Sequence, residues 1–295
     1  MRRVVTSYSL HRSASGRLSS GTDSSEPDKL RGKVTQIQNV PKVVRDIIVP
    51  LPGHVLLQGD WAAIEWAISM WMASKYDKDR FHLDILDRFQ AGEFDPHRYL
   101  ASFVYELPED QIDKLMRDTC KPYTHGRTYL GWEEELARKA GHPAKTAYKV
   151  CGVHEEAFRV HYWQQQVVAF VKKKHYVQTP LGWRRYFWGV QKNRKDLEKL
   201  FGLYTPKPAE VIATLVSSTA ADLCKVVLGM VFAELPDGWE VLTSTHDSIM
   251  LMAPAQDAER GKAWLKAKME SPIPWMDGRT WRADVRVGTN WKEVS

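Results

Sequence analysis

The stretch HVLLQGDWAAIEWAISMWMAS occupies residues 54–74 and changes its hydrophobic pattern halfway along. Its first part is a short apolar run that follows a Pro-Gly pair, which predicts a buried strand ending at Asp60. In its second part, apolar residues recur at helical spacing, which predicts a helix from Ala62 to about Lys75. The pattern therefore predicts a carboxylate held at the end of a buried strand, immediately before a helix.

A second stretch, WEVLTSTHDSIMLMA at residues 239–253, predicts two strands on either side of a tight His-Asp turn. Asp60 and Asp247 therefore both lie where a sheet holds a side chain rigidly, and they can converge on one site. Two convergent aspartates are the minimum needed to hold a pair of Mg²⁺ ions. The residues alone leave the ordinary alternatives open, because an aspartate at a strand end often caps a helix and an aspartate in a turn often only forms the turn.

The remaining segments place these two stretches in a larger architecture. The first 33 residues are rich in Ser, Gly and Arg and predict loops with weak strands. Residues 76 to about 175 are mainly helical in pattern, and residues 179–188 predict a turn with short strands. A long helix from about Ala209 to Leu235 is apolar over most of its surface, so we expect it to be deeply buried. We therefore expect an α+β fold in which one sheet-based body is split by a helical lobe.

The composition excludes several classes of protein. The chain has 295 residues, of which 43% are hydrophobic and 26% charged, a balance typical of a packed globular protein. Its net charge of +6 is consistent with a polyanionic partner. Cys120, Cys151 and Cys224 are far apart in the chain and fit reduced thiols better than disulfides or a zinc site. With no secretory signal and no apolar run expected to span a bilayer, we expect a cytoplasmic protein that does not use a membrane.

Three motifs resemble, in the same order, those of family A DNA polymerases, the bacterial DNA polymerase I type. GDWAAIEWAISMWMAS (59–74) resembles motif A, RDTCKPYTHGRTYLG (117–131) resembles motif B, and THDSIML (245–251) resembles motif C. Further matches follow the family's order, among them SASGRLSS, QNVP, FDPHRYLASFVY and VGTNW. The agreement covers nearly all of the chain.

The resemblance implies a right-hand polymerase fold, with an antiparallel palm sheet and helical fingers. It assigns residues 1–75 and 206–295 to the palm and residues 76–205 to the fingers, with the thumb and the 3′–5′ exonuclease missing. The implied reaction is template-directed addition of deoxynucleotides to a primer 3′-hydroxyl, with two Mg²⁺ ions as cofactors and with primer-template DNA and dNTPs as partners. Without a thumb, we expect weak DNA binding unless a separate chain supplies the thumb or the exonuclease. A phage-like, virus or plasmid origin is a further expectation for so compact a chain.

Motif B supplies most of the implied nucleotide site. Four of its residues are each four positions apart, so on a helix they share one face, with cations for the phosphates and rings for the base and sugar. They are Arg117, Lys121, His125 and Tyr129. The resemblance adds His97 as a triphosphate contact, names Lys121 or His97 as the proton donor to the leaving pyrophosphate, and names Glu65 as the group that blocks a ribose 2′-hydroxyl. The residue pattern alone also allows a solvated basic helix edge.

The resemblance implies metal ligands and DNA contacts as well. Asp60, Asp247 and the backbone carbonyl of Trp61 would hold the two Mg²⁺ ions. His246 would orient the primer terminus beside Asp247, and Arg17 would contact the minor-groove side of the primer-template. Two further cations, which belong to a basic stretch outside the motifs, can contact DNA phosphates or simply form a solvated face. These are Arg184 and Arg185.

Several positions depart from the family pattern. His125 stands where Phe or Tyr is usual, Pro122 lies within the predicted motif B helix, and Ser248 follows His-Asp where Glu is usual. Two alternatives to an active DNA polymerase therefore stay open. One is a nucleic-acid-binding regulatory or partner subunit of a split polymerase with weak or no activity. The other is an RNA-synthesising relative, because single-subunit RNA polymerases carry His-Asp-Ser, although Glu65 argues against it.

Overall fold

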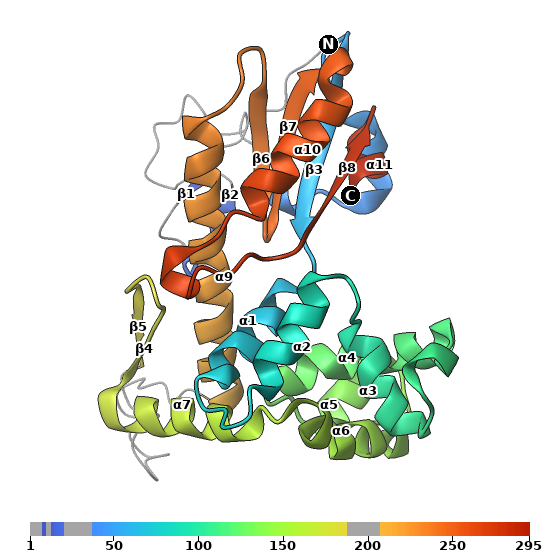
Figure 1. Cartoon of the computed structure of the whole chain (residues 1–295), viewed down its shortest axis with the longest axis vertical. Helices are drawn as coiled ribbons and strands as arrows, with labels where there is room; N and C mark the ends of the chain where they lie inside the picture. The colour runs from blue at the N-terminus through green and yellow to red at the C-terminus, as the bar shows by residue number, and fades with distance from the viewer. Residues whose placement is uncertain (1–7, 10–12, 21–36, 188–206) are drawn as a thin grey trace, which may run out of the picture. The chain divides into compact units, whose positions relative to one another are not determined.

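The computed structural model describes residues 8–9, 13–20, 37–187 and 207–295. The chain divides into a sheet unit, residues 1–64 with 217–295, and a helical unit, residues 65–216 (Figure 1). Most of the loops predicted for residues 1–33, and the boundary predicted at 205–206, lie outside the described residues. The two units together give the α+β class that the sequence predicts, mostly helical with an antiparallel sheet.

The main sheet of the sheet unit has four antiparallel strands in the order β6-β7-β3-β8 (Figure 1). The central strand β3 buries Leu56 and Leu57 completely, which confirms the buried strand predicted before Asp60. The elements of this unit are β1 (Tyr8–Ser9), β2 (Ser19–Ser20), η1 (Ile37–Asn39), η2 (Lys42–Ile47), β3 (His54–Trp61), β6 (Glu240–Thr245), β7 (Ser248–Pro254), η4 (Ala255–Asp257), α10 (Ala258–Met269), η5 (Pro274–Met276), β8 (Ala283–Gly288) and α11 (Trp291–Val294).

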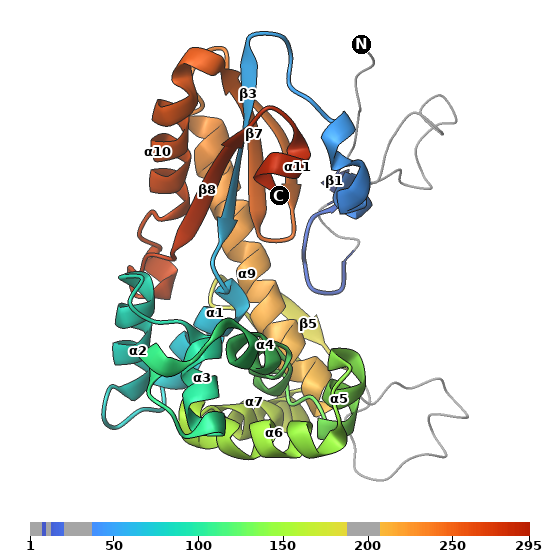
Figure 2. The same cartoon turned by 90° about the vertical axis from the view of Figure 1, so that its right-hand side faces the viewer.

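The end of β3 is fixed by its contact with α10, which lies along one face of the sheet (Figure 2). A Cβ at Gly59 would lie only 2.2 Å from the Sδ atom of Met269, so the helix approaches β3 as closely as a glycine allows. One residue after Asp60, the indole N–H of Trp61 donates to the backbone carbonyl of Met269 at 3.0 Å. Asp60 therefore lies between two positions that are both anchored to α10.

The hairpin predicted for residues 239–253 is present. Strands β6 and β7 are joined by a two-residue turn made of His246 and Asp247, and His246 has a left-handed backbone with φ of 57°. The turn is closed by Ser248, whose hydroxyl donates to the backbone carbonyl of Thr245 at 2.9 Å. This geometry holds Asp247 at the tip of the hairpin.

The helical unit is built around Trp66 of α1. The Trp66 ring is fully buried, stacks on Phe94 and meets the edges of Phe89 and Phe158, with ring centroids 5.2 to 5.8 Å apart. The elements of this unit are α1 (Ile64–Ser74), α2 (Phe81–Gln90), α3 (Pro96–Tyr105), η3 (Glu109–Gln111), α4 (Lys114–Thr128), α5 (Glu133–Ala140), α6 (Ala144–Phe158), α7 (His161–Lys174), β4 (Tyr176–Gln178) and β5 (Arg184–Tyr186). Because Trp66 packs here, α1 belongs to the helical unit; the names palm and fingers stay predictions.

The long helix α9 (Pro208–Ala233) confirms the apolar helix predicted from about residue 209. Among the described helices, it is the one whose length and composition would suit a membrane span. In this structure 72% of its most apolar window is buried inside the protein. Such burial is the property of a core helix, as the sequence predicts.

Candidate functional site

Two features of the sheet bring Asp60 and the hairpin turn together, namely the strand register and a backbone hydrogen bond. In the β3–β7 pairing Asp60 lies opposite Ser248, which directly follows Asp247 in the chain. One residue beyond, the backbone N–H of Trp61 donates to the backbone carbonyl of Asp247 at 3.3 Å. The two predicted carboxylate ligands thus meet at one end of the sheet, where β3 ends and β7 begins. We call this place the carboxylate corner and include Trp61 in it (Asp60, Trp61 and Asp247).

The negative charge of the carboxylate corner is only partly offset by nearby cations. Burial within the surrounding protein, and next the negative charge of Asp247, raise the pKa of Asp60 to about 7, although the residue keeps contact with solvent. Arg286 and Lys42 lower this pKa and Asp284 raises it, but these effects are smaller than that of burial. Asp284 lies opposite Asp60 in the β3–β8 pairing. A cation placed between the two carboxylates would favour their ionised forms.

The donors of the corner suit Mg²⁺ better than a metal that needs a complete protein cage. In the described ranges, no group of three or more His, Cys, Asp or Glu side chains is arranged to hold a metal ion. Mg²⁺ commonly binds through one or two carboxylates and completes its shell with water and substrate phosphates. Asp60, Asp247 and the carbonyl of Trp61 are donors of that kind, so they fit the two-ion site that the sequence predicts.

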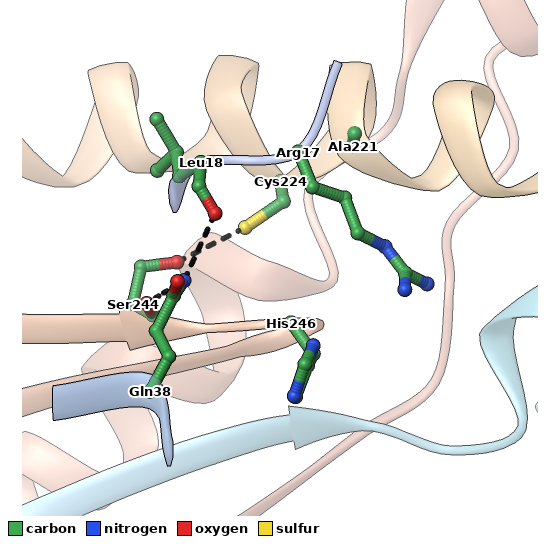
Figure 3. A pocket seen from close by; sticks show the side chains of 7 residues that line it. All are labelled: Arg17, Leu18, Gln38, Ala221, Cys224, Ser244 and His246. Carbon is green, nitrogen blue, oxygen red and sulfur yellow. Dashed lines mark hydrogen bonds between the residues drawn. The ribbon is translucent and has the colours of Figure 1, made fainter. Parts of the chain in front are cut away.

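Arg17 and His246 line one small pocket of the sheet unit (Figure 3). Gln38 connects two segments that line this pocket, because its side-chain amide donates to the backbone carbonyls of Leu18 and Ser244 at 3.0 and 3.1 Å. Beside it, the Cys224 thiol lies 3.4 Å from the Ser244 hydroxyl. The structure therefore brings the two residues predicted to contact the primer-template to the same place, next to the turn that carries Asp247.

In the helical unit, the predicted phosphate ligand Arg117 is already engaged by carboxylates. Its Nε donates to Asp95 at 2.8 Å and an Nη donates to the neighbouring Asp118 at 3.0 Å. The other oxygen of Asp95 accepts the backbone N–H groups of His97 and Arg98 and so caps α3. One carboxylate thus fixes both the start of α3 and the guanidinium of Arg117.

His97 and His125 face each other, with ring centroids 5.2 Å apart. Burial, and next the positive charge of His125, lower the pKa of His97 to about 4. Burial also lowers the pKa of His125, against an opposing effect of Glu65. Both rings are therefore neutral at pH 7 in the ligand-free chain.

Glu65 and Tyr129 meet directly, because the Tyr129 hydroxyl donates to the Glu65 carboxylate. Helix α4 ends at Thr128, so Tyr129 is its C-terminal cap residue rather than part of its last turn. Pro122 lies inside α4, as the sequence indicates. The structure thus gathers the whole predicted nucleotide set within the helical unit: Glu65, His97, Arg117, Lys121, His125 and Tyr129.

The two adjacent arginines of strand β5 have different surroundings. Arg185 donates to the Glu210 carboxylate at 2.7 Å and to the Thr214 hydroxyl at 2.9 Å, which ties the hairpin to α9. Arg184 is exposed and lies over the Tyr176 ring, 4.8 Å from its centroid. The Nε of Arg184 also donates to the side-chain oxygen of Gln178 at 2.5 Å, so both arginines are hydrogen-bonded, but only Arg184 is exposed.

Two residues of these sites were given no role from the sequence. Asp95 belongs to the Asp-Pro-His-Arg stretch, and Asp followed by Pro is a helix-start signal that could have identified its capping oxygen. Gln38 opens the QNVP match, but a lone glutamine carries no local signal for a contact 206 positions away. The roles of both residues depend on contacts with segments that are distant in the sequence, which local sequence patterns do not predict.

Comparison with known proteins gives the same family as the motifs. The profile of DNA polymerase family A matches residues 1–293. The chain is similar to a thermostable DNA polymerase I of Thermus thermophilus, at 27% identity over 299 residues, and to a DNA polymerase I of Caldicellulosiruptor bescii, at 24% over 304 residues. These alignments cover 98% and 99% of this chain but 32% of each relative.

A solved structure shares the fold. The POL domain of Pol1 from M. smegmatis, in complex with a DNA primer-template and dNTP, superposes with a TM-score of 0.73 at 22% identity. The match covers 98% of this chain and 48% of that one. The chain therefore spans about a third of the length of the curated relatives and about half of that structure.

Proposed function

Because the chain belongs to DNA polymerase family A, we propose that it adds deoxynucleotides to a primer 3′-hydroxyl under the direction of a DNA template. The observation that carries this proposal is the carboxylate corner, where β3 and the β6–β7 turn bring Asp60 and Asp247 to one edge of the sheet. The right-hand assignment of palm and fingers belongs to the same proposal.

The residues of the corner would hold two Mg²⁺ ions through the Asp60 and Asp247 carboxylates and the Trp61 carbonyl. When bound, such ions activate the attacking oxygen and stabilise the leaving phosphate oxygens. Arg117 and Lys121 bind the triphosphate, and Lys121 gives a proton to the departing pyrophosphate. Neutral His97 donates a hydrogen bond to a phosphate oxygen. Glu65, oriented by Tyr129, occupies the space that a ribose 2′-hydroxyl would need.

Primer extension tests the proposal directly. The purified chain, a labelled primer-template, Mg²⁺ and four dNTPs should give extended product, and Asp60→Ala should give none. The exposed Asp237→Ala in the same unit is the matched control and should extend normally. Unchanged extension by the Asp60→Ala, Asp247→Ala double variant would refute the assignment.

A regulatory or partner subunit is the second candidate, because Pro122 inside α4 removes a helix hydrogen bond within the nucleotide set. It predicts DNA binding with no extension by the wild-type chain under any metal condition. An RNA-synthesising enzyme would instead extend with ribonucleotides as well as with dNTPs.

A further inference from the structure

The positive charge of the chain is concentrated in one segment. No Asp or Glu occurs between Glu156 and Asp196, and these 39 residues contain nine of the 42 Lys and Arg. The remaining 256 residues carry 33 Lys and Arg against 36 Asp and Glu, a net charge of −3. The net charge of +6 therefore arises entirely from this segment, whose described part contains α7 and the β4–β5 hairpin.

The β4–β5 hairpin has two chemically distinct faces. Register pairs Tyr176 with Tyr186 and Gln178 with Arg184 on one face, and Val177 with Arg185 on the other. The second face is held to the rest of the helical unit by burial of Val177 and by the bonds of Arg185 to α9. The first face is not needed for that attachment.

The β4–β5 hairpin directly follows α7 in the chain (Figure 1). Aromatic rings and cations of the two elements gather on the first face of the hairpin. Tyr176 lies 5.4 Å from the ring of Phe170 and 5.5 Å from the ring of Tyr186. The guanidinium of Arg184 covers the Tyr176 ring, and Phe170 shares its helix face with Lys173 and Lys174 at spacings of three and four. We call this surface the ring face: Phe170, Lys173, Lys174, Tyr176, Arg184 and Tyr186.

The ring face exposes apolar area that folding does not require. Phe170 is 43% exposed and Tyr186 is 46% exposed, and Lys173, Lys174 and Arg184 are exposed beside them. Rings that remain accessible next to several cations, with no acidic residue in the whole segment, complement a ligand that is both flat and anionic.

We propose that the ring face binds single-stranded DNA, with unpaired bases stacked on its rings and phosphates bound by Arg184, Lys173 and Lys174. The choice of DNA rests on the proposed polymerase function, in which the natural occupant is the unpaired template strand. Duplex DNA fits less well, because its base faces are hidden by stacking and it would engage the cations alone. Each ring used for stacking contributes binding energy without reading the sequence.

Fluorescence anisotropy with a labelled dT16 strand and with a blunt duplex tests the proposal. Tyr186→Ala should weaken binding of the single strand about tenfold, since stacking on one ring is worth roughly 1–3 kcal/mol, and should change duplex binding less than twofold. Tyr186→Phe should restore single-strand binding because the ring remains. Tyr148→Ala, a 54% exposed tyrosine of α6, is the control and should bind as the wild type does.

Salt dependence separates the rings from the cations. Arg184→Ala should make the plot of log affinity against log salt shallower by about 0.7 for the single strand, the value for one lost phosphate contact. Tyr186→Ala should leave that slope unchanged. Equal single-strand affinity in wild type, Tyr186→Ala and Arg184→Ala, with thermal unfolding unaltered, would overturn the inference.

The assay needs no catalysis, so its outcome is independent of primer extension. If the ring-face variants lose single-strand binding and the wild type does not extend primers, the ring face is retained as a DNA site and the polymerase proposal is rejected. If the wild type extends primers and the ring-face variants bind single-stranded DNA as well as the wild type does, the polymerase proposal is retained and the ring face is rejected as a DNA site. Competition by polyglutamate as strong as by dT16 would mark a site for an acidic protein and overturn the assignment to DNA.

Discussion

At the end of β3, the charge of Asp247 helps to raise the pKa of Asp60, whereas on α4 the guanidinium of Arg117 already has carboxylate partners in Asp95 and Asp118. At the carboxylate corner, burial and the charge of Asp247 thus outweigh the effect of Arg286 and Lys42 on the pKa of Asp60. The nucleotide set is a cationic site that the chain has compensated internally. In the ligand-free chain the ionised form of Asp60 carries an electrostatic cost, whereas the guanidinium of Arg117 is paired.

This difference indicates how each site gains from its ligand. A divalent cation at the corner relieves repulsion that is present beforehand, so its binding stabilises the fold directly. A triphosphate at the nucleotide set enters a place where cations are already held in position. Its binding therefore depends on orientation and is sensitive to the residues that fix Arg117 and Glu65.

The largest expected effect among the nucleotide residues is that of Arg117→Ala. Removal of a positioned donor to a charged transition state commonly costs about 100- to 1000-fold in rate, so kcat/KM for dNTPs should fall by that order. Steady-state primer extension measures it. Arg138→Ala, an exposed arginine of α5, is the control, and an equal loss in both variants would show that Arg117 acts only through general charge.

Removal of the Glu65 side chain is expected to change sugar selection by about 100-fold, a differential transition-state effect of roughly 3 kcal/mol. The ratio of ATP to dATP incorporation should rise in Glu65→Ala. Tyr129→Phe removes only the hydroxyl that bonds Glu65, so it should raise the ratio by a smaller factor. A ratio unchanged in both variants would contradict the steric role.

A smaller effect is expected from Asp95→Asn. Asparagine retains an oxygen to cap α3 but removes the charge that holds Arg117, so KM for dNTPs should rise about tenfold with kcat nearly unchanged, a loss of about 1.4 kcal/mol. Asp113→Asn makes the same change at the cap of α4, where the carboxylate accepts from the Met116 N–H at 2.8 Å. Equal KM values for the two variants would show that Asp95 acts only as a helix cap.

The sequence predicts local structure well in this chain. A short apolar run after a Pro-Gly pair predicts β3, which ends near Asp60. Two strands on either side of a His-Asp turn predict the β6–β7 hairpin and the place of Asp247 in it. The spacing of four in motif B predicts a common face for Arg117, Lys121 and His125 because helix geometry is local.

Partners that are distant in sequence could not be predicted in the same way. The Arg117–Asp95 pair joins residues 22 positions apart, and the Arg185–Glu210 pair joins residues 25 positions apart. Each depends on how helices pack, which charge patterns alone do not determine. For the same reason the sequence treats Arg184 and Arg185 alike, although opposite faces of one strand give them different surroundings.

Thermal unfolding of the wild type and Asp60→Asn, with and without Mg²⁺, is the most direct test for a Mg²⁺ site at the end of β3. The folded-state pKa of Asp60 is raised to about 7 from 3.8, so its ionisation costs stability as pH rises through this range, and the full cost is present above pH 7. Because water screens an exposed carboxylate, we expect a cost of about 1 kcal/mol.

At pH 8 without Mg²⁺, Asp60→Asn should therefore unfold a few degrees above the wild type, and near pH 3 the two should coincide. Mg²⁺ at pH 8 should raise the unfolding temperature of the wild type and of the control Asp237→Asn, but not that of Asp60→Asn. Equal responses to Mg²⁺ in all three proteins, with no stabilisation by Asp60→Asn, would contradict a Mg²⁺ site at the end of β3.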